Sequence, residues 1–328
     1  MATQLSRFSY KPVFIMRNIS DAAINLVRKF GFEIKLIAGR VDIFKVDCEN
    51  EFKFLDGIAK LDNGEKTLIV DHYGYHALIL RECKKWFSNI VVIDDYQPER
   101  CIADVDIVIN PNISADTLEY VQHKGQILLL GSRYAILREQ FTARVNDYFV
   151  REQCYNIAIC FGACDTAGMI FPVLHMLSQI GRELSVTVIV GADYKFINQF
   201  QDLGAAYPHE LVVKQDVDNV ADLLLRQDLL IMSPSSIALE AMALGVPSAF
   251  FICENNQRTG GYGMRDEGIA CYLGEAGLVD WKKVRDKVKQ LINNYRLRLK
   301  YSLRSQKYVD GKGALRVAGL IHRHIGHL

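Results

Sequence analysis

Residues 229–245, LLIMSPSSIALEAMALG, contain the pattern that decides the fold. The apolar run Leu229–Met232 lacks strict alternation, which is typical of a strand covered on both faces of a sheet. A polar turn, Ser233–Ser236, separates this run from Ile237–Leu244, whose pattern indicates a helix. Gly245 follows the last helical turn, and glycine at that position is a helix stop signal. The stretch therefore predicts one strand-turn-helix unit.

This unit repeats along the chain, because short apolar runs alternate with polar turns and with amphipathic stretches such as Asp21–Phe30. The runs expected as strands are Val13–Met16, Thr67–Val70, Ile90–Ile93, Asp106–Ile109, Gln126–Leu130, Asn156–Cys160, Val186–Val190, Leu211–Val213, Leu229–Met232 and Ser248–Cys253. Strands that alternate with helices indicate parallel sheets with crossover helices. The predicted class is therefore α/β.

Two domains are expected, because ten strands in 328 residues exceed one comfortable hydrophobic core. The polar stretch Phe141–Tyr155 is the best seam, so we predict Rossmann-like domains over residues 1–145 and 146–328. No long Pro/Gly/Ser linker marks the seam, which favours closely docked domains.

Composition excludes several classes of protein. Lys and Arg number 39 against 38 Asp and Glu, which argues against a protein built for nucleic acid or acidic membranes. No apolar run approaches the ~20 residues that span a bilayer, and the first ten residues lack a signal-peptide pattern, so we expect a cytoplasmic protein. The eight cysteines form no CxxC pair, and we interpret them as buried small hydrophobes with no metal site.

The segment Trp281–Lys307 holds ten Lys and Arg against one acid, Asp286. One interpretation is contact with anionic lipid or a polyanionic partner. The favoured interpretation is one or two helices with a solvated basic face. Their apolar residues would dock on the domain; these are Val284, Val288, Leu291 and Ile292.

Polar groups gather after several predicted strands, at the carboxyl ends where open parallel sheets bind ligands. Examples are Asp71–Gly74, Gly131–Tyr134, Gly162–Asp165 and Ser233–Ser236. A single polar turn means little, but this accumulation favours a cleft between two facing sheet edges.

The turn Ser233–Ser236 opens a helix, whose first N–H groups and partial positive charge suit a diphosphate. Glu240 lies about one turn further on and has the capacity to accept two hydrogen bonds from a ribose diol. The alternative is that Ser235 or Ser236 merely caps the helix and that Glu240 merely complements its dipole.

Two other turns leave alternatives open. Gly162 permits close approach of the backbone to a phosphate, but its turn matches neither a GxGxxG fingerprint nor a P-loop. His72, between Asp71 and Tyr73, has a side chain suited to a catalytic base. It is equally consistent with a half-buried structural histidine held by the adjacent carboxylate.

These turns, in this order, resemble one family. The matching segments are Leu68–Gly74, Val92–Asp95, Asp106–Asn112, Gly131–Arg138, Gly162–Asp165, Ser233–Ser248, Asn256–Gln257 and Val309–Arg316. They resemble the UDP-2,4-diacetamido-2,4,6-trideoxy-β-L-altropyranose hydrolase of pseudaminic acid synthesis. That family is related to the two-domain GT-B fold of inverting glycosyltransferases, in which two Rossmann-like domains face each other across a cleft.

The resemblance implies a hydrolysis that uses no metal and no cofactor: water attacks the anomeric carbon, UDP leaves and the configuration inverts. UDP would lie against the second domain. Its implied contacts are Gly162 and Asp165 near the diphosphate, Ser235 and Ser236 at the phosphate, and Glu240 at the ribose. On the sugar side, the implied catalytic residues are Tyr73 and Asn256, and the implied substrate contacts are Asp71, His72 and Gln257.

The sequence departs from the family in three places. The family opens with a strand and a GxGHxxR turn whose histidine is the base, whereas Met1–Ser6 resembles the middle of the following helix. Two explanations stand: a translation start set too late, or a shortened relative without this chemistry. Losing a strand would leave Val13–Met16 unpaired on one side, so that the first domain is strained or recruits a partner chain. The other departures are Ala163 in place of a second glycine and Gly168 in place of an asparagine.

Three functions therefore remain as hypotheses. The first is the UDP-sugar hydrolase, either active or inactive in this chain. The second is a UDP-sugar glycosyltransferase of the same fold, which needs an acceptor. The third is a non-catalytic UDP-sugar-binding subunit. Each takes a UDP-sugar as its small-molecule partner, and none involves nucleic acid or a membrane span.

Overall fold

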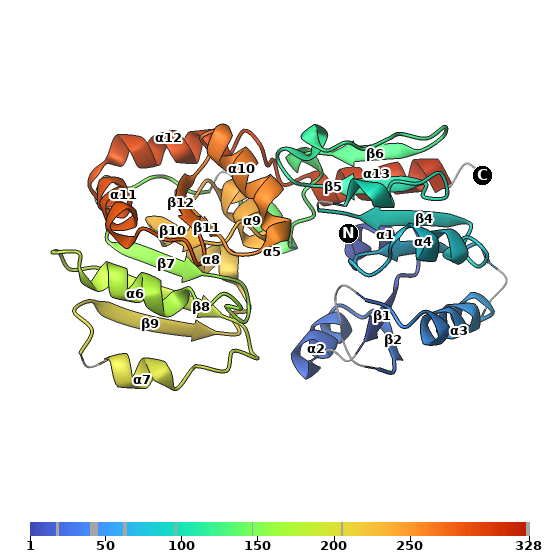
Figure 1. Ribbon diagram of the computed structural model, residues 1–328, viewed down its shortest axis with the longest axis horizontal. Helices are drawn as coiled ribbons and strands as arrows, with labels where there is room; N and C mark the ends of the chain where they lie inside the picture. The colour runs from blue at the N-terminus through green and yellow to red at the C-terminus, as the bar shows by residue number, and fades with distance from the viewer. Residues whose placement is uncertain are drawn as a thin grey trace. The chain divides into compact units, whose positions relative to one another are not determined.

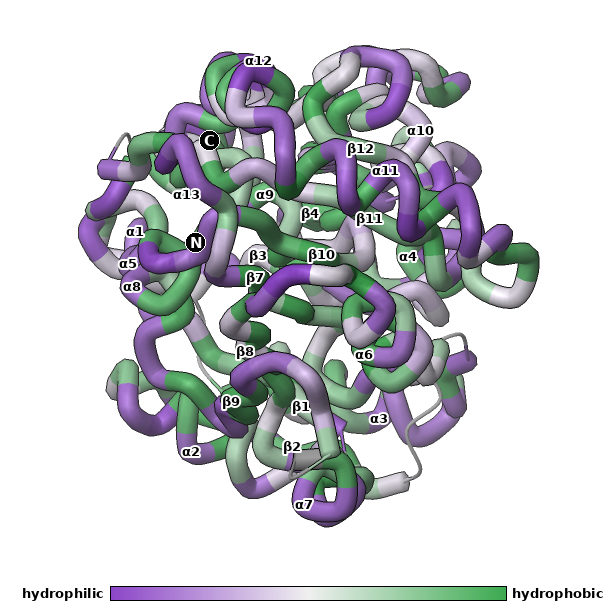
Figure 2. The backbone as a smooth tube through the Cα atoms, turned by 90° about the vertical axis from the view of Figure 1, so that its left-hand side faces the viewer, coloured by the Kyte–Doolittle hydropathy of each residue, from purple (hydrophilic) through white to green (hydrophobic). Residues whose placement is uncertain are grey.

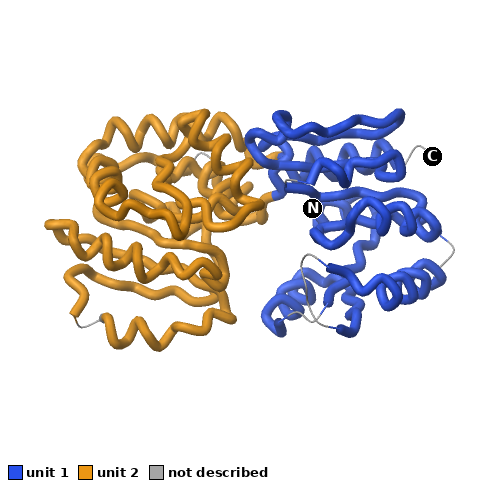
Figure 3. The backbone as a smooth tube through the Cα atoms, in the orientation of Figure 1, with its two compact units in different colours: residues 1–136, 313–328 blue, residues 137–312 orange. Residues whose placement is uncertain are grey.

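The computed structural model describes residues 1–17, 20–39, 45–61, 64–95, 97–145, 147–204 and 206–325. They form two compact units (Figure 3). Unit 1 contains Met1–Ile136 and Gly313–Leu328, and unit 2 contains Leu137–Lys312. These bounds differ from the predicted domains 1–145 and 146–328, because the last helix returns to unit 1.

That helix is α13 (Gly313–Ile325). Its apolar face, with Val317 and Ile321, packs in one cluster with Ile107 and Ile109 of the unit 1 sheet. A C-terminal helix with an apolar stripe needs a sheet face to bury it. The face that it covers belongs to unit 1, which explains why the chain crosses between the units twice.

Unit 2 is a six-stranded parallel sheet with the strand order β12-β11-β10-β7-β8-β9. Its strands are β7 (Asn156–Cys160), β8 (Ser185–Val190), β9 (Glu210–Gln215), β10 (Leu229–Met232), β11 (Ser248–Ile252) and β12 (Cys271–Glu275). Every residue of β10 and β11 is buried, as expected for strands covered on both faces. Apart from Ser248, every residue of these two strands is hydrophobic (Figure 2).

Helices cover this sheet (Figure 1). They are α5 (Glu139–Thr142), α6 (Ile170–Ser178), α7 (Gln199–Gly204), α8 (Val220–Leu224), α9 (Ser236–Leu244), α10 (Arg258–Asp266), α11 (Trp281–Asn293) and α12 (Tyr295–Ser305). The predicted helix after β10 is α9, and it ends at Gly245 with a φ of 91°, the left-handed stop that the sequence indicates.

Unit 1 contains two separate parallel sheets, β1-β2 and β3-β4-β5-β6. The strands are β1 (Val13–Arg17), β2 (Glu33–Ile37), β3 (Thr67–Val70), β4 (Asn89–Ile93), β5 (Ile107–Asn110) and β6 (Ile127–Leu130). The α-helices besides α13 are α1 (Ala2–Ser6), α2 (Asp21–Lys29), α3 (Cys48–Ala59) and α4 (Ala77–Cys83). Within unit 1, Figure 1 shows the β1-β2 pair apart from β4, β5 and β6.

The basic segment forms α11 and α12, and the predicted docking residues Val284, Val288, Leu291 and Ile292 are all buried. One basic residue departs from the expected solvated face. Arg298 is fully buried and donates to the carbonyl oxygens of Leu291 (2.7 Å) and Ile292 (2.9 Å). It therefore supplies donors to carbonyls near the end of α11, which lack partners within the helix.

The cysteines only partly follow the expectation of buried residues. Cys83, Cys101, Cys154 and Cys160 are buried, but Cys48 and Cys164 are exposed, because they lie at a helix start and in a turn rather than in a strand. Across the described ranges, no helix is long and apolar enough to cross a bilayer.

Candidate functional site

The start of α9 lies at the carboxyl end of β10, at the edge where ligands of parallel sheets bind. Ser235 is the N-cap residue, yet its side chain makes no capping hydrogen bond to the helix. The interpretation of Ser235 as a plain side-chain cap is therefore not what the structure shows. The first N–H groups of a helix have no partner within the helix, the Ser235 side chain does not supply one here, and Ser236 is exposed. This arrangement suits an anionic ligand.

Glu240 lies one turn into α9 and is 5% exposed. Its two carboxylate oxygens accept hydrogen bonds from Arg138, from Nε at 2.7 Å and from Nη2 at 2.8 Å. Burial raises the pKa of the Glu240 carboxyl, and the paired Arg138 guanidinium opposes that shift. A carboxylate has about four acceptor positions, so this pair leaves about two for a ligand.

Arg138 was not predicted as a site residue. It belongs to unit 2 and directly precedes α5, and its guanidinium also lies over the ring of Phe141, 5.0 Å from the centroid. Glu240 is about a hundred positions away in the sequence, so local pattern gives no signal for the pair. The bidentate geometry holds the Glu240 carboxylate in one orientation.

The turn after β7 contains three residues with positive φ: Gly162 at 77°, Asp165 at 47° and Gly168 at 64°. A Cβ at Gly162 would meet no atom within 4 Å, so the backbone there faces open space. The Ala163 side chain lies beside Gly191, where an added Cβ would be 2.7 Å from the Ala163 Cβ.

Asp165 is 6% exposed, and its carboxylate oxygens accept from the backbone N–H groups of Met169 (2.8 Å) and Ile170 (2.9 Å). Burial raises the pKa of this carboxyl, and the two backbone hydrogen bonds oppose the shift. The carboxylate is thus engaged with the first turn of α6. Any contribution to a bound diphosphate would come through the shape of the turn.

Replacing Asp165 by alanine will lower the free energy of unfolding by about 2 kcal/mol, because two buried N–H groups lose a charged acceptor. Urea unfolding followed by circular dichroism measures this change. Asp193→Ala, at an exposed position of another turn in unit 2, is the matched control and should change stability little. Equal effects of the two substitutions would contradict the assigned role of Asp165.

In unit 1, the carboxyl ends of β3, β4 and β5 bring a second group of predicted residues together. The Tyr73 hydroxyl donates to Oδ2 of Asp95, and the side-chain amides of Asn110 (2.9 Å) and Asn112 (3.1 Å) donate to the Asp95 carbonyl. Burial raises the pKa of the Asp95 carboxyl; Tyr73 opposes the shift, and the neighbouring carboxylates of Asp94 and Asp71 add to it.

Asp71 is exposed, but surrounding protein still desolvates its carboxyl enough to raise the pKa, against the opposing charges of Arg100 and His72. Two carboxyl groups with raised pKa values therefore lie near each other at this edge. Perturbed carboxyl groups of this kind are typical of sites that move protons.

The contacts of the His72 side chain hold the local backbone and a neighbouring ring in place. Its Nδ1 accepts from the backbone N–H of Gly74 at 3.0 Å, and its ring meets the ring of Tyr75 edge-on, with centroids 5.8 Å apart. This geometry fits the half-buried structural interpretation more closely than a free catalytic base.

Arg100 and Asp94 complete this edge and were not predicted as site residues. Arg100 is 1% exposed, donates to the carbonyls of His72 (3.1 Å) and Tyr75 (3.2 Å), and pairs with Asp94 at 3.4 Å. It therefore ties the turn after β3 to the turn after β4. The one signal in the sequence was the doubled Asp94–Asp95 after a strand.

Asn256 and Gln257 lie in unit 2, in the 3-10 turn Asn255–Gln257 after β11. Gln257 Oε1 accepts from the backbone N–H of Cys253 at 2.9 Å, so this side chain fixes the turn, and Asn256 is half-buried. Across the described residues, no group of three His, Cys, Asp or Glu side chains could hold a metal ion.

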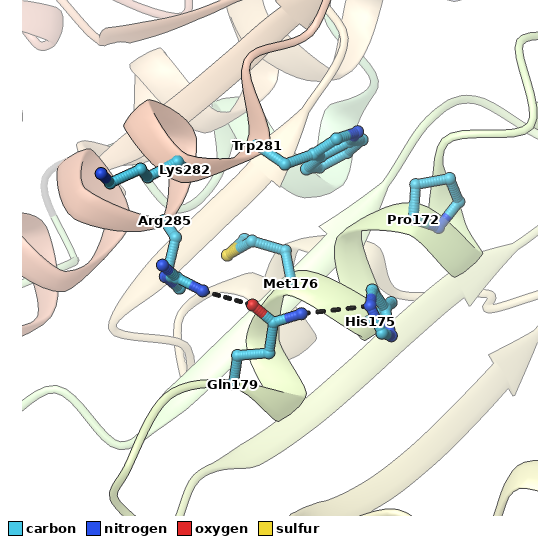
Figure 4. Close-up of a pocket in the computed structure, with 7 residues that line it drawn as sticks. All are labelled: Pro172, His175, Met176, Gln179, Trp281, Lys282 and Arg285. Carbon is cyan, nitrogen blue, oxygen red and sulfur yellow. Dashed lines mark hydrogen bonds between the residues drawn. The ribbon is translucent and has the colours of Figure 1, made fainter.

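A surface cavity of about 260 Å³ lies elsewhere in unit 2, between α6 and α11 (Figure 4). Gln179 links its polar side chains, because it accepts from Arg285 and lies 3.1 Å from Nε2 of His175. None of the predicted site residues lines this cavity; its lining residues are Pro172, His175, Met176, Gln179, Trp281, Lys282 and Arg285.

Comparison with solved structures shows the class of fold to which the chain belongs. MurG of Acinetobacter baumannii matches with a TM-score of 0.65 at 13% identity, covering 98% of this chain and 94% of that one. Staphylococcus aureus MnaA with UDP matches with a TM-score of 0.61 at 11% identity, covering 96% of this chain and 97% of that one. Arabidopsis thaliana UGT89C1 with UDP matches with a TM-score of 0.61 at 10% identity, covering 98% of this chain and 94% of that one. The predicted fold class is confirmed: the chain has the GT-B type of fold, built of two Rossmann-like domains.

Comparison of the sequence with known proteins finds relatives. No family model matches. The chain is 25% identical over 208 residues to the UDP-2,4-diacetamido-2,4,6-trideoxy-β-L-altropyranose hydrolase of Campylobacter jejuni, covering 62% of this chain and 71% of the hydrolase. It is also 26% identical over 267 residues to the Bacillus subtilis spore coat polysaccharide biosynthesis protein SpsG, covering 77% of this chain and 75% of SpsG. The uncharacterized protein MJ1062 of Methanocaldococcus jannaschii is 22% identical over 75% of this chain, which spans 50% of that protein. The predicted resemblance to the hydrolase is thus confirmed.

Proposed function

We propose that this chain is a UDP-sugar hydrolase that releases UDP from a UDP-2,4-diacetamido-2,4,6-trideoxyhexose, with inversion at the anomeric carbon. The observation that carries the proposal is the start of α9, where the N-cap Ser235 makes no side-chain cap and the buried Glu240 follows about one turn later. The likeness to the Campylobacter jejuni hydrolase supplies the substrate class. The proposed setting is the cytoplasmic synthesis of a nonulosonic acid such as pseudaminic acid.

In unit 2, the proposed ligand is the UDP moiety. The N–H groups at the start of α9, with Ser235 and Ser236, bind a phosphate. The open backbone at Gly162 admits the diphosphate, and Asp165 holds that turn in place. Glu240 accepts hydrogen bonds from both hydroxyls of the ribose, at the acceptor positions that Arg138 leaves free. The helix terminus also stabilises the negative charge that develops on departing UDP.

In unit 1, the proposed sugar contacts are Tyr73, Asp71 and His72. In unit 2, taken by itself, Asn256 and Gln257 are proposed as substrate-binding residues of the turn after β11. Hydrolysis needs a group that takes a proton from water as its oxygen bonds to the anomeric carbon and the bond to UDP breaks. We assign this step to the Asp71 and Asp95 carboxyl groups, because both have raised pKa values and Tyr73 donates to Asp95.

The direct test is incubation of the purified chain with the UDP-altropyranose sugar, with UDP release and anomeric configuration followed by NMR. Release of UDP and an inverted free sugar without any acceptor supports the proposal. Release only when an acceptor is added would identify a glycosyltransferase instead. Binding of UDP by calorimetry without turnover would leave a UDP-sugar-binding subunit, and dependence of activity on a second protein would identify a partner chain.

The rate of hydrolysis should fall in acid at a higher pH than an ordinary aspartate would give. A base must be ionised to act, and a raised pKa keeps Asp71 and Asp95 protonated above the ordinary value of 3.8. The measurement is kcat/KM against pH for the wild-type chain. Asp95→Asn and Asp71→Asn should each lower kcat, about 100-fold for a lost base. An unchanged profile and rate in both variants would contradict this assignment.

A further inference from the structure

The cavity between α6 and α11, called the α6–α11 cavity below, has a lining that suits one kind of ligand (Figure 4). Its lining residues on α6 are spaced as i, i+3, i+4 and i+7 and therefore form one face of that helix, whereas those on α11 come from the start of that helix. The volume of about 260 Å³ is slightly below the range of about 300–1,000 Å³ that is usual for drug-sized ligands. The cavity therefore fits a small molecule.

Part of the lining of the α6–α11 cavity is apolar. Met176 is 2% exposed, and the Trp281 ring packs on the buried ring of Phe251, with centroids 5.7 Å apart. This contact holds the indole against the core of unit 2, so the indole is a fixed wall of the cavity. Pro172 adds a third apolar side chain. An apolar group of a ligand would be favoured here, because it would be removed from water.

The charged side chains of the cavity are basic. Among the described residues, no Asp or Glu lines the cavity, and no carboxylate pairs with the side chain of Lys282 or Arg285. Asp280, which precedes α11, pairs with Lys283 instead, at 3.2 Å. Two cations without a carboxylate partner favour an anionic ligand.

Arg285 has one edge of its guanidinium available. Its Nη1 donates to Oε1 of Gln179, and the Gln179 amide nitrogen donates to Nε2 of His175 at 3.1 Å, so Gln179 fixes the guanidinium. The buried Nε of Arg285 has no hydrogen-bond acceptor among the residues that the structure describes. Nε and Nη2 form the edge with which Arg138 holds the Glu240 carboxylate. The same edge of Arg285 is therefore suited to an oxyanion, which would supply the missing acceptor.

We propose that the α6–α11 cavity binds a small amphipathic anion, namely a carboxylate or phosphate that carries a ring or a short aliphatic group. Two oxygens of the anion accept from Nε and Nη2 of Arg285, and Lys282 adds a second positive charge. The apolar group lies against Trp281 and Met176. None of the residues assigned to UDP lines this cavity, so the inference stands whether or not the proposed function holds.

An anionic membrane is the other partner that a basic segment can contact. Trp281 is poorly placed to insert into lipid, because it is half-buried and packs on Phe251. The exposed Asp286 also lies among the basic residues of α11. A cavity between two helices favours a soluble ligand that enters it over a flat surface that lies across them.

Trp281 fluorescence tests the site. Trp281 is one of two tryptophans in the chain, so Trp86→Phe leaves it as the sole reporter. Phenyl phosphate and benzoate are probes that combine an oxyanion with a ring, whereas inorganic phosphate and phenol each supply one part alone. At least one combined probe should give a saturable change and bind more tightly than either part. Arg285→Gln should weaken that binding about tenfold or more, because hydrogen bonds to a charged group are lost.

Two further variants separate geometry from charge. Arg285→Lys keeps the charge but loses the planar fork, and it should also weaken binding. Arg296→Gln removes an exposed cation from α12 in the same basic segment and should leave the affinity unchanged. Calorimetry on the wild-type chain measures the same affinities without Trp86→Phe, and circular dichroism shows that each variant is folded.

Absence of a saturable response to both combined probes at millimolar concentrations would overturn the inference, as would unchanged affinity in folded Arg285→Gln. Equal affinity for inorganic phosphate would also overturn it, because the apolar wall would then play no part. Binding of the chain to phosphatidylglycerol vesicles, lost in Arg285→Gln and without a response to the soluble probes, would identify a membrane contact instead.

Discussion

Replacing Glu240 by alanine will weaken UDP binding about 10- to 100-fold. A hydrogen bond to a charged group contributes about 1.5–3 kcal/mol, and about 1.4 kcal/mol corresponds to tenfold in affinity. Glu240 is the one ionised group that we assign to the ribose, and its carboxylate is buried and held by Arg138. Isothermal titration calorimetry with UDP measures the change directly.

Two further variants separate binding from folding in this experiment. Glu210→Ala removes an exposed carboxylate from β9 of the same unit and should leave the affinity for UDP unchanged. Arg138→Met removes the partner of Glu240 and should weaken binding less than Glu240→Ala, because the acceptor oxygens remain. Unchanged affinity in a folded Glu240→Ala protein would show that the ribose assignment is wrong.

Replacing Gly313 by alanine will destabilise unit 1 by about 3 kcal/mol, at the upper end of the usual cost of overpacking. Gly313 opens α13, and a Cβ there would lie 2.2 Å from the carbonyl oxygen of Ala135 and 2.6 Å from its backbone nitrogen. Backbone atoms cannot rotate away as a side chain can, so α13 must shift off the sheet. Urea unfolding and exchange of the α13 amides measure the loss.

Gly319→Ala is the matched control within the same helix. The nearest atom to a Cβ at that position is Arg323 Nη1, at 3.9 Å, so the methyl group fits. Alanine is favoured over glycine inside a helix by about 1 kcal/mol, and Gly319→Ala should therefore leave stability unchanged or raise it. Comparable destabilisation by both substitutions would contradict the close approach assigned to Gly313.

The sequence predicted the regular part of the fold because continuous apolar runs are a strong signal of buried parallel strands. It missed β2 (Glu33–Ile37), whose charges alternate with apolar residues, and β12 (Cys271–Glu275). In β12, Gly274 has a φ of 141°, and the register with β11 shifts between Phe250 and Phe251. The return of α13 to unit 1 was also missed, since sequence order does not reveal which sheet face a terminal helix covers.

The candidate site was predictable where it depends on local order. Turns that follow the parallel strands of one sheet lie at the same edge of that sheet. The sequence alone therefore placed Ser235 and Asp71 at strand ends, each in its own sheet. The partners that shape the site were not predictable, because they join distant positions. Arg138 reaches Glu240 across the sequence of unit 2, and Arg100 joins the turns after β3 and β4. An arginine that pairs with a distant residue leaves no periodic signal in the sequence.

The most direct test of the central claim is an NMR titration of the ¹⁵N-labelled chain with UDP, read at the backbone amides. The account predicts saturable shifts at Ser235, Ser236 and Ile237, with weaker shifts in the Gly162 turn and loss of the response in Glu240→Ala. Absence of any shift at the start of α9, or shifts confined to the cavity between α6 and α11, would contradict it.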